Sequence, residues 1–227
     1  MFVDRLYYPV STLGPGQRIA LWTRGCSKHC SGCANPELWE AAADAYIENE
    51  KLADILLDLA ARTGTHRLTV TGGDPLEQAD DLAQVLATVR PAFDDILVYT
   101  GYILEGETAP RRGVSSSGAP PARSADDLSE DETPLRGAVS PRGSVSSGSF
   151  RLPDALDPLI DVVIDGPYVE ALNDGICGLR GSANQRLIVR NPALEKLYHE
   201  EERKPRRVQN AVFDGRAISI GIHGRPA

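Results

Sequence analysis

Three of the four cysteines of this chain lie within eight residues of each other, and no other feature restricts the local fold as strongly. Cys26, Cys30 and Cys33 form a Cys-x3-Cys-x2-Cys pattern, whereas Cys177 is far away in the sequence. A short loop with three thiolates can hold three irons of a four-iron cluster. The fourth iron would then have no cysteine ligand and could bind a substrate or cofactor. This arrangement favours chemistry at the iron over simple electron transfer.

Two other interpretations of the cysteines stay open. A structural zinc site needs four ligands, so zinc would also require Cys177 or His29. His29 is directly beside Cys30, which is a poor spacing for two ligands on one ion, and we interpret it as a packing residue. The third interpretation is a set of thiols without a metal. A disulfide framework is not expected, because the cysteines are clustered and no secretory signal precedes them.

Length and charge narrow the class of protein. A chain of 227 residues with 41% hydrophobic content can bury one substantial core. Its net charge of −8 argues against broad nucleic-acid binding, which needs a basic surface. No apolar run approaches the roughly 20 residues that cross a bilayer. We therefore expect a cytoplasmic protein, in a compartment where thiols stay reduced and can bind metal.

Strand and helix patterns alternate along most of the chain. Apolar runs predict strands at 18–23, 68–71, 96–100 and 160–164, and an amphipathic helix is predicted at 51–62. A further strand at 217–222 would add an edge to the sheet. Polar motifs follow several of these strands. Strands separated by helices indicate a mostly parallel sheet whose active edge lies at the carboxyl ends of the strands.

Residues 105–149 interrupt this alternation. The segment is rich in Ser, Gly, Pro and charged residues, and it contains no aromatic residue. Such a composition cannot bury enough apolar surface to offset the entropy of ordering. We expect a disordered insertion within a single domain that comprises 1–104 and 150–227. A role for the insertion in docking a partner is the alternative.

A second motif follows the strand predicted at 68–71. Gly72 and Gly73 have no side chains and allow close approach of a ligand to the backbone. Asp74 is placed to cap the next helix, and Pro75 suits its first position. A cationic amine here would find the carboxylate of Asp74. Alone, the motif also fits an ordinary turn from a strand to a helix.

Together, the two motifs resemble the radical S-adenosylmethionine superfamily. Within it, the chain is similar to the activating enzymes of glycyl-radical proteins, above all the branch that activates anaerobic ribonucleoside-triphosphate reductase. The residues that carry the resemblance are, in chain order, 14–18, 24–39, 71–76, 99–102, 164–168 and 180–186. The resemblance implies an α/β fold, an open or partial (β/α) barrel with a mostly parallel sheet.

The resemblance also implies two cofactors and their binding residues. Cys26, Cys30 and Cys33 would bind a [4Fe–4S] cluster, whose free iron would chelate S-adenosyl-L-methionine. The other residues that the resemblance assigns to cofactor binding are Gly72, Gly73 and Asp74 at the methionine amine, Gly32 and Ala34 near the adenine, and Arg180, Ser182 and Asn184 at the carboxylate or ribose. The last three also fit a polar turn before a strand.

The implied activity is reductive cleavage of S-adenosylmethionine to a 5′-deoxyadenosyl radical, which generates a glycyl radical on a partner enzyme. That partner would resemble anaerobic ribonucleotide reductase, and a flavodoxin- or ferredoxin-type protein would supply the electron. One alternative is a radical enzyme that acts on a small molecule, as a deazaguanine synthase does. Another is a metal-stabilised binding module without enzymatic activity.

Overall fold

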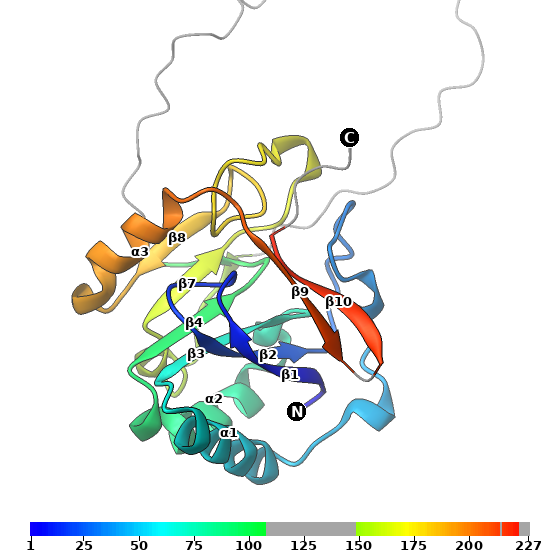
Figure 1. Ribbon diagram of the computed structural model, residues 1–227, viewed down its shortest axis with the longest axis vertical. Helices are drawn as coiled ribbons and strands as arrows, with labels where there is room; N and C mark the ends of the chain where they lie inside the picture. The colour runs from blue at the N-terminus through cyan, green and yellow to red at the C-terminus, as the bar shows by residue number, and fades with distance from the viewer. Residues whose placement is uncertain (108–148, 214, 223–227) are drawn as a thin grey trace, which may run out of the picture. The chain divides into compact units, whose positions relative to one another are not determined.

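The computed structural model describes residues 1–107, 149–213 and 215–222 of the chain (Figure 1). The expected insertion at 105–149 therefore lies almost wholly outside the described residues, and its disorder stays a prediction. The residues that flank it are described. Strand β5 (Ile103–Leu104) pairs in parallel with strand β6 (Ser149–Phe150), so the two ends of the segment are side by side.

Six strands form the main sheet, in the spatial order β1, β2, β3, β4, β7 and β8. Their bounds are Val3–Val10, Arg18–Thr23, Arg67–Gly72, Asp95–Tyr99, Val162–Asp165 and Arg186–Val189. The four central strands run parallel, whereas β1 and β8 are antiparallel to their neighbours. The predicted α/β fold with a mostly parallel sheet is confirmed. Among the described residues β1 does not pair with β8, so the sheet is open there.

Strand β1 is not among the predicted strands. Most of its residues are half-buried on both faces, and it carries Asp4 and Arg5 within its length. The period-two alternation of apolar and polar residues is therefore weak, as is common for a strand at the edge of a sheet.

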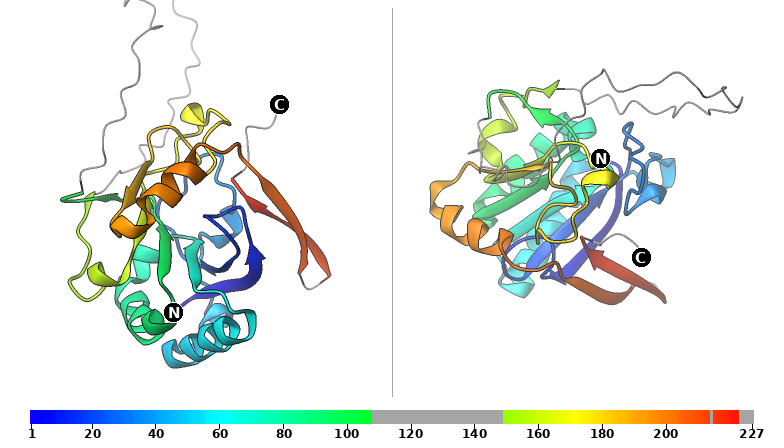
Figure 2. Two further views of the ribbon diagram at one scale, coloured as in Figure 1. Left: turned by 60° about the vertical axis from the view of Figure 1, so that its left-hand side comes forward. Right: turned by 90° about the horizontal axis from the view of Figure 1, so that it is seen from above.

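Helices cover both faces of the sheet (Figures 1 and 2). The α-helices are α1 (Asn49–Thr63), α2 (Ala79–Val89) and α3 (Glu195–Glu202). Short 3₁₀ turns occur at Pro36–Leu38, Ala43–Ala45, Pro75–Gln78, Arg90–Ala92, Asp157–Leu159, Glu170–Leu172 and Pro192–Leu194. The predicted helix at 51–62 corresponds to α1. Its C-cap is Gly64, in the left-handed conformation that glycine favours.

The alternation of side chains along β4 divides the core in two. Ile96 and Val98 pack in the cluster that contains the apolar faces of α1 and α2. Leu97 points the other way and packs with Tyr198 of α3. Because successive strand residues face opposite sides, α3 lies on the face opposite to α1 and α2. Both faces of the central strands are thus buried, as parallel sheets require.

A buried ion pair and its hydrogen bonds connect strands β2, β3 and β4 with helix α3. Arg18 of β2 and Asp95 of β4 are both buried, and two guanidinium nitrogens of Arg18 donate to the carboxylate at 2.6 and 3.1 Å. Arg18 Nε also donates to Thr69 Oγ1 of β3 at 2.7 Å. Tyr198 of α3 donates its hydroxyl to Asp95 at 2.5 Å. The charge of Arg18 is therefore paired and hydrogen-bonded within the core.

The last described strands form a separate hairpin. Strands β9 (Val208–Phe213) and β10 (Arg216–Gly221) form a two-stranded antiparallel sheet (Figure 2). The prediction that 217–222 adds an edge to the main sheet is wrong, because this strand pairs with β9 instead. Ile220 packs against Trp22, on the face of the main sheet that is turned away from α1 and α2.

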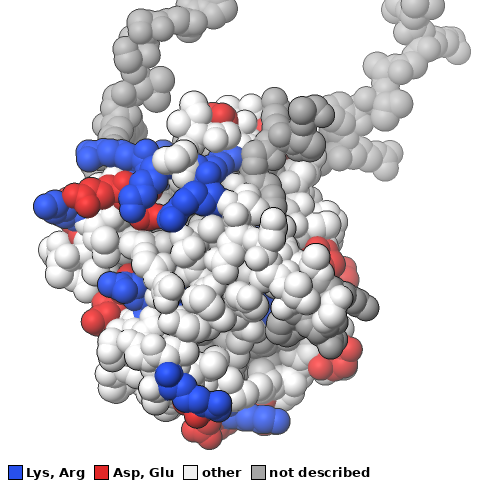
Figure 3. Space-filling view, viewed as in Figure 1, with Lys and Arg blue, Asp and Glu red and all other residues white. Residues whose placement is uncertain are grey.

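Basic side chains gather near α3 and the start of β9 on the face shown in Figure 3. They are largely neutralised by acidic neighbours. Lys204 and Arg207 both pair with the buried carboxylate of Glu201. This cluster therefore connects α3 to the hairpin.

In the described part of the chain, no helix has the length and apolar character that a membrane span needs.

Candidate functional site

The two predicted motifs lie at the carboxyl ends of neighbouring parallel strands. The cysteine loop follows β2, and Gly73 and Asp74 follow β3. The register of these strands pairs Thr23 with Gly72, which brings the start of each motif to the same edge. Ligands of open α/β sheets bind at this edge. The fold thus places the two motifs where the sequence pattern predicts a site.

Backbone hydrogen bonds join the motifs directly. Gly73 N donates to Thr23 O, and Asp74 N donates to Gly25 O, both at 2.8 Å. A Cβ on Gly73 would lie against the carbonyl of Gly25, and one on Gly72 against the backbone of Thr23, closer than real Cβ atoms come. Gly72 therefore admits the backbone at the end of β2, and Gly73 admits the start of the cysteine loop, neighbours that the sequence does not reveal.

We expect Gly73→Ala to lower the free energy of unfolding by about 2–3 kcal/mol, because the added methyl must displace the Gly25 carbonyl and the cysteine loop with it. Gly64→Ala is the matched control, since no atom lies within 4 Å of a Cβ added there. It should cost only about 1 kcal/mol, from its left-handed conformation. Urea unfolding compares the variants. An equal or smaller loss for Gly73→Ala would contradict the close packing.

The cysteine loop is fixed at both ends. Gly25 N and Cys26 N donate at 2.9 Å to the carbonyls of Leu38 and Trp39, where the loop returns to the sheet. The ring of His29 stacks on that of Trp39, with centroids 4.6 Å apart. The packing role predicted for His29 is therefore confirmed.

All three loop cysteines are free thiols; Cys30 is buried, and Cys26 and Cys33 are half-buried. Among the described residues no three His, Cys, Asp or Glu side chains are grouped as a metal ion would require. The role of the thiols as ligands therefore stays a prediction. Their chemistry fits it, because three thiols on one short loop, fixed at both ends, are the donors that iron–sulfur clusters use.

Burial favours the protonated form of two of these thiols, Cys26 and Cys30. It raises the pKa of Cys26 from 9.0 to about 11. It also raises the pKa of Cys30, and the negative charge of a Cys33 thiolate would raise it further. Because metal ligation requires thiolates, loading of the loop must release protons.

The raised pKa of Cys26 predicts a loss of stability in alkaline solution. The folded protein holds this proton more tightly than the unfolded chain, so the stabilisation is complete below pH 9 and is lost as the pH rises from 9 to about 11. We expect the unfolding free energy of metal-free Cys26→Ala to fall less steeply over this range than that of the parent. Anaerobic urea unfolding with chelator and reductant measures both slopes. Equal slopes would refute the assignment.

Asp74 is the most enclosed carboxylate of the site. Its Oδ1 accepts from Leu76 N at 3.1 Å, which confirms the predicted cap, although a 3₁₀ turn precedes α2. Thr100 Oγ1 donates at 2.9 Å and Gly101 N at 2.9 Å. The ammonium of Lys28 lies 2.8 Å from Oδ2. The carboxylate is thus already paired with a cation from the cysteine loop.

Lys28, Glu77 and Glu170 also contribute to this site and are not among the predicted residues. Lys28 pairs with Asp74, and its position between Cys26 and Cys30 is the signal that could have identified it. Glu170 accepts from Ser31 Oγ at 2.9 Å. Glu170 is 139 positions from Ser31 in the chain, so no local sequence signal could have indicated the contact.

Glu170 belongs to a segment that lies against the cysteine loop. A Cβ on Gly32 would meet Glu170 Cδ at 2.8 Å, and Gly32 has a φ of +69°. The backbone of Tyr168 is close enough to the thiol of Cys30 to lower its pKa, against the larger effect of burial. Ala34 is exposed on the same loop. The proximity of Gly32 and Ala34 to an adenine stays a prediction.

Arg180, Ser182 and Asn184 bond to other parts of the protein. Ser182 is buried and accepts from Val169 N at 3.1 Å, and Asn184 donates to the carbonyl of Pro167 at 2.7 Å. The guanidinium of Arg180 pairs with a carboxylate of α3. Ser182 and Asn184 therefore position the segment that touches the cysteine loop. A direct contact of these three residues with a cofactor stays a prediction.

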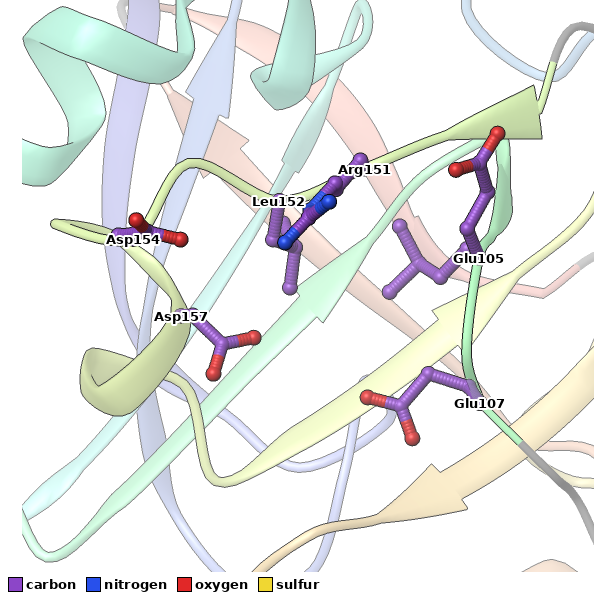
Figure 4. Close-up of a pocket in the computed structure, with 7 residues that line it drawn as sticks. Glu105, Glu107, Arg151, Leu152, Asp154 and Asp157 are labelled. Atoms are coloured by element: carbon purple, nitrogen blue, oxygen red, sulfur yellow. The ribbon is translucent and has the colours of Figure 1, made fainter.

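A hollow of about 190 Å³ lies apart from these motifs (Figure 4). Its lining residues are Leu104, Glu105, Glu107, Arg151, Leu152, Asp154 and Asp157. None of the predicted cysteine, glycine or aspartate site residues lines it. It borders the segment outside the described residues, and we assign it no role in the site.

Comparisons with known proteins agree with the two motifs. A family model described as a 4Fe-4S single cluster domain matches residues 12–112. The anaerobic ribonucleoside-triphosphate reductase-activating protein of Pasteurella multocida is 30% identical over 79% of this chain and 92% of its own length. The proteins of the same name from Vibrio cholerae and Escherichia coli K12 are 28% and 26% identical, over 92% and 93% of their lengths.

Among solved structures, QueE from Escherichia coli aligns with a TM-score of 0.36 and 17% identity, over 44% of this chain and 51% of that one. This likeness is too low to support an argument about fold or substrate. The relatives matched along nearly their whole length give the assignment instead. The chain belongs to the family of anaerobic ribonucleoside-triphosphate reductase-activating proteins.

Proposed function

We propose that this chain is a radical S-adenosylmethionine activating enzyme that generates a glycyl radical on a partner such as anaerobic ribonucleotide reductase. The observation that carries the proposal is the direct backbone link between two motifs. A loop with Cys26, Cys30 and Cys33 is hydrogen-bonded to a turn that presents the buried carboxylate of Asp74. One motif offers iron ligands and the other an acceptor for the amine of the cofactor.

The chemistry that the bound cofactors supply is one-electron reduction of the sulfonium, which breaks a C–S bond to give methionine and a 5′-deoxyadenosyl radical that takes a hydrogen atom from a glycine Cα. The protein's part is to bind and shield. The three cysteines would hold the cluster, and Asp74 would orient the amine. Gly73 admits the backbone of Gly25 and so keeps the two motifs in contact. No side chain is needed as a general acid or base.

Several finer features belong to the same proposal. The names of the relatives support a reductase of the anaerobic ribonucleotide class as the partner. A flavodoxin- or ferredoxin-type protein would donate the electron, and the cytoplasm would keep the thiols reduced. The open, mostly parallel sheet is compatible with the expected partial barrel.

The test is anaerobic reconstitution of the full chain with iron and sulfide, followed by dithionite and S-adenosylmethionine. We expect 5′-deoxyadenosine to form. When an anaerobic ribonucleoside-triphosphate reductase is added, a glycyl radical should appear in its electron paramagnetic resonance spectrum. 5′-Deoxyadenosine without a glycyl radical on any such reductase would favour a small-molecule substrate. A colourless protein that retains zinc and binds no iron would refute the proposal and favour a binding module.

A further inference from the structure

Two carboxylates and an aromatic ring form a binding site for an ammonium group beside the cysteine loop, and the ammonium of Lys28 occupies it. Lys28 Nζ is 2.8 Å from Asp74 Oδ2 and 3.5 Å from Glu77 Oε1. It also lies 3.2 Å from the centroid of the Tyr102 ring, in the geometry of a cation–π contact. The side chains of Lys28 and Asp74 are only 5% and 1% exposed. The carboxylate, the ring and Glu77 therefore surround one positive charge.

The carboxylate of Asp74 has no acceptor position left while Lys28 is bound. An ionised carboxylate offers about four lone-pair sites. Leu76 N, the Thr100 hydroxyl and Gly101 N each donate to Asp74, and Lys28 is the fourth donor. The first three belong to the turn after β3 and the loop after β4, which are part of the frame. Of the two side-chain donors, Thr100 has a short side chain on a buried residue, whereas Lys28 has a long one that can rotate away from Asp74.

The stem of Lys28 is packed as tightly as its ammonium. A Cβ on Gly101 would lie 2.5 Å from Lys28 Cδ, so the absence of a side chain at Gly101 makes room for the lysine. Glu77 is a second partner close to the first and is more exposed, at 21% against 1% for Asp74. A small rotation of the lysine stem would carry the ammonium from Asp74 to Glu77. The charge of Lys28 would stay paired after such a move.

We propose that Lys28 occupies the site on Asp74 that the α-ammonium of S-adenosylmethionine takes, so that binding of this cofactor displaces Lys28 toward Glu77. This inference rests on the proposed function. When a site is free in only a fraction of the molecules, the apparent affinity of a ligand for that site is reduced in proportion to that fraction. Lys28 thus sets how tightly the cofactor binds.

The test is equilibrium binding of S-adenosylmethionine to anaerobically reconstituted full chain, without reductant, so that no cleavage occurs. Lys28→Met removes the charge and keeps the length of the side chain. We expect it to bind S-adenosylmethionine about tenfold more tightly than the parent. Lys28→Arg keeps a competing charge and should show no such gain. Lys51→Met, on an exposed position of α1, is the matched control and should bind like the parent.

The outcomes distinguish a failure of the Lys28 displacement from a failure of the proposed function. Equal or weaker binding by Lys28→Met, with binding by the parent intact, would overturn the inference and leave the proposed function standing. If none of the iron-loaded proteins binds S-adenosylmethionine, the proposed function fails, and the inference with it. Equal iron content and circular dichroism would show that the variants are folded alike.

A second measurement uses the unaltered protein. The chain has four lysines, Lys28, Lys51, Lys196 and Lys204, so acetylation of each can be followed by mass spectrometry. Lys28 should react slowly relative to Lys196, whose side chain is 90% exposed. Saturating S-adenosylmethionine should speed the acetylation of Lys28 and leave that of Lys196 unchanged. Unchanged or slower reaction of Lys28 would contradict its displacement.

Discussion

Replacing Cys30 with serine is expected to abolish iron–sulfur loading, with iron falling from roughly four atoms per chain to near none after anaerobic reconstitution. Cys30 is the buried member of the three loop thiols, whereas Cys26 and Cys33 are half-buried. Serine keeps nearly the same size but is a poor ligand for iron. Cleavage of S-adenosylmethionine should fall to background in the same sample. Iron and sulfide analysis with an absorption spectrum measures the loading.

Cys177→Ser is the matched control for this prediction. Cys177 is also buried, but it lies beside Arg180, whose Nε is 3.3 Å from the sulfur. We expect the control to keep its iron, because Cys177 is outside the loop. Equal loss of iron in both variants would contradict the assignment of the three loop cysteines. Loss of iron in the control alone would contradict it more strongly.

Asp95→Ala is expected to lower the free energy of unfolding by about 3–5 kcal/mol. The change leaves the guanidinium of Arg18 buried without its counter-charge, and it also removes the acceptor of the Tyr198 hydroxyl. Arg18 lies at the start of β2, at the opposite end from the cysteine loop. Stability should therefore fall while the folded fraction still binds iron. Urea unfolding together with iron analysis separates the two effects.

An exposed ion pair provides the comparison. Asp58 and Arg62 pair on the surface of α1, with side chains 51% and 73% exposed. Asp58→Ala should have a far smaller effect, because exposed pairs contribute little. The double variant Arg18→Met with Asp95→Leu should recover much of the loss, since it removes both charges from the core. Similar losses for Asp95→Ala and Asp58→Ala would show that burial of the pair does not matter.

The parts of the fold that could be predicted are those governed by local periodicity. The apolar run at 18–23 coincides with β2, and the spacing of Leu52 and Leu56 marks the buried face of α1. Gly64 ends that helix because the chain turns left-handed there. The sequence also predicts the edge of the sheet at which the cysteine loop and the turn of Gly72, Gly73 and Asp74 meet, because parallel strands bring their carboxyl ends together.

What could not be predicted depends on contacts between distant segments. The strand at 216–221 has a strand pattern, but its position in one apolar cluster with Trp22, far away in the chain, is not visible in that pattern. The pair of Lys28 with Asp74 and that of Ser31 with Glu170 join polar residues. Periodicity reports which face of an element is buried. It carries no information about which polar side chains meet.

The parallel pairing of β5 with β6 sets a lower limit on the length of the chain between them. Two parallel strands cannot be joined by a tight hairpin, because the chain must reverse direction twice, and such connections need about a dozen residues or more. Lengthening a loop, in contrast, adds closure entropy only slowly. The segment between these strands should therefore tolerate insertion better than complete removal. A foreign domain could be grafted at this position, whereas complete excision of the segment would break the strand pair.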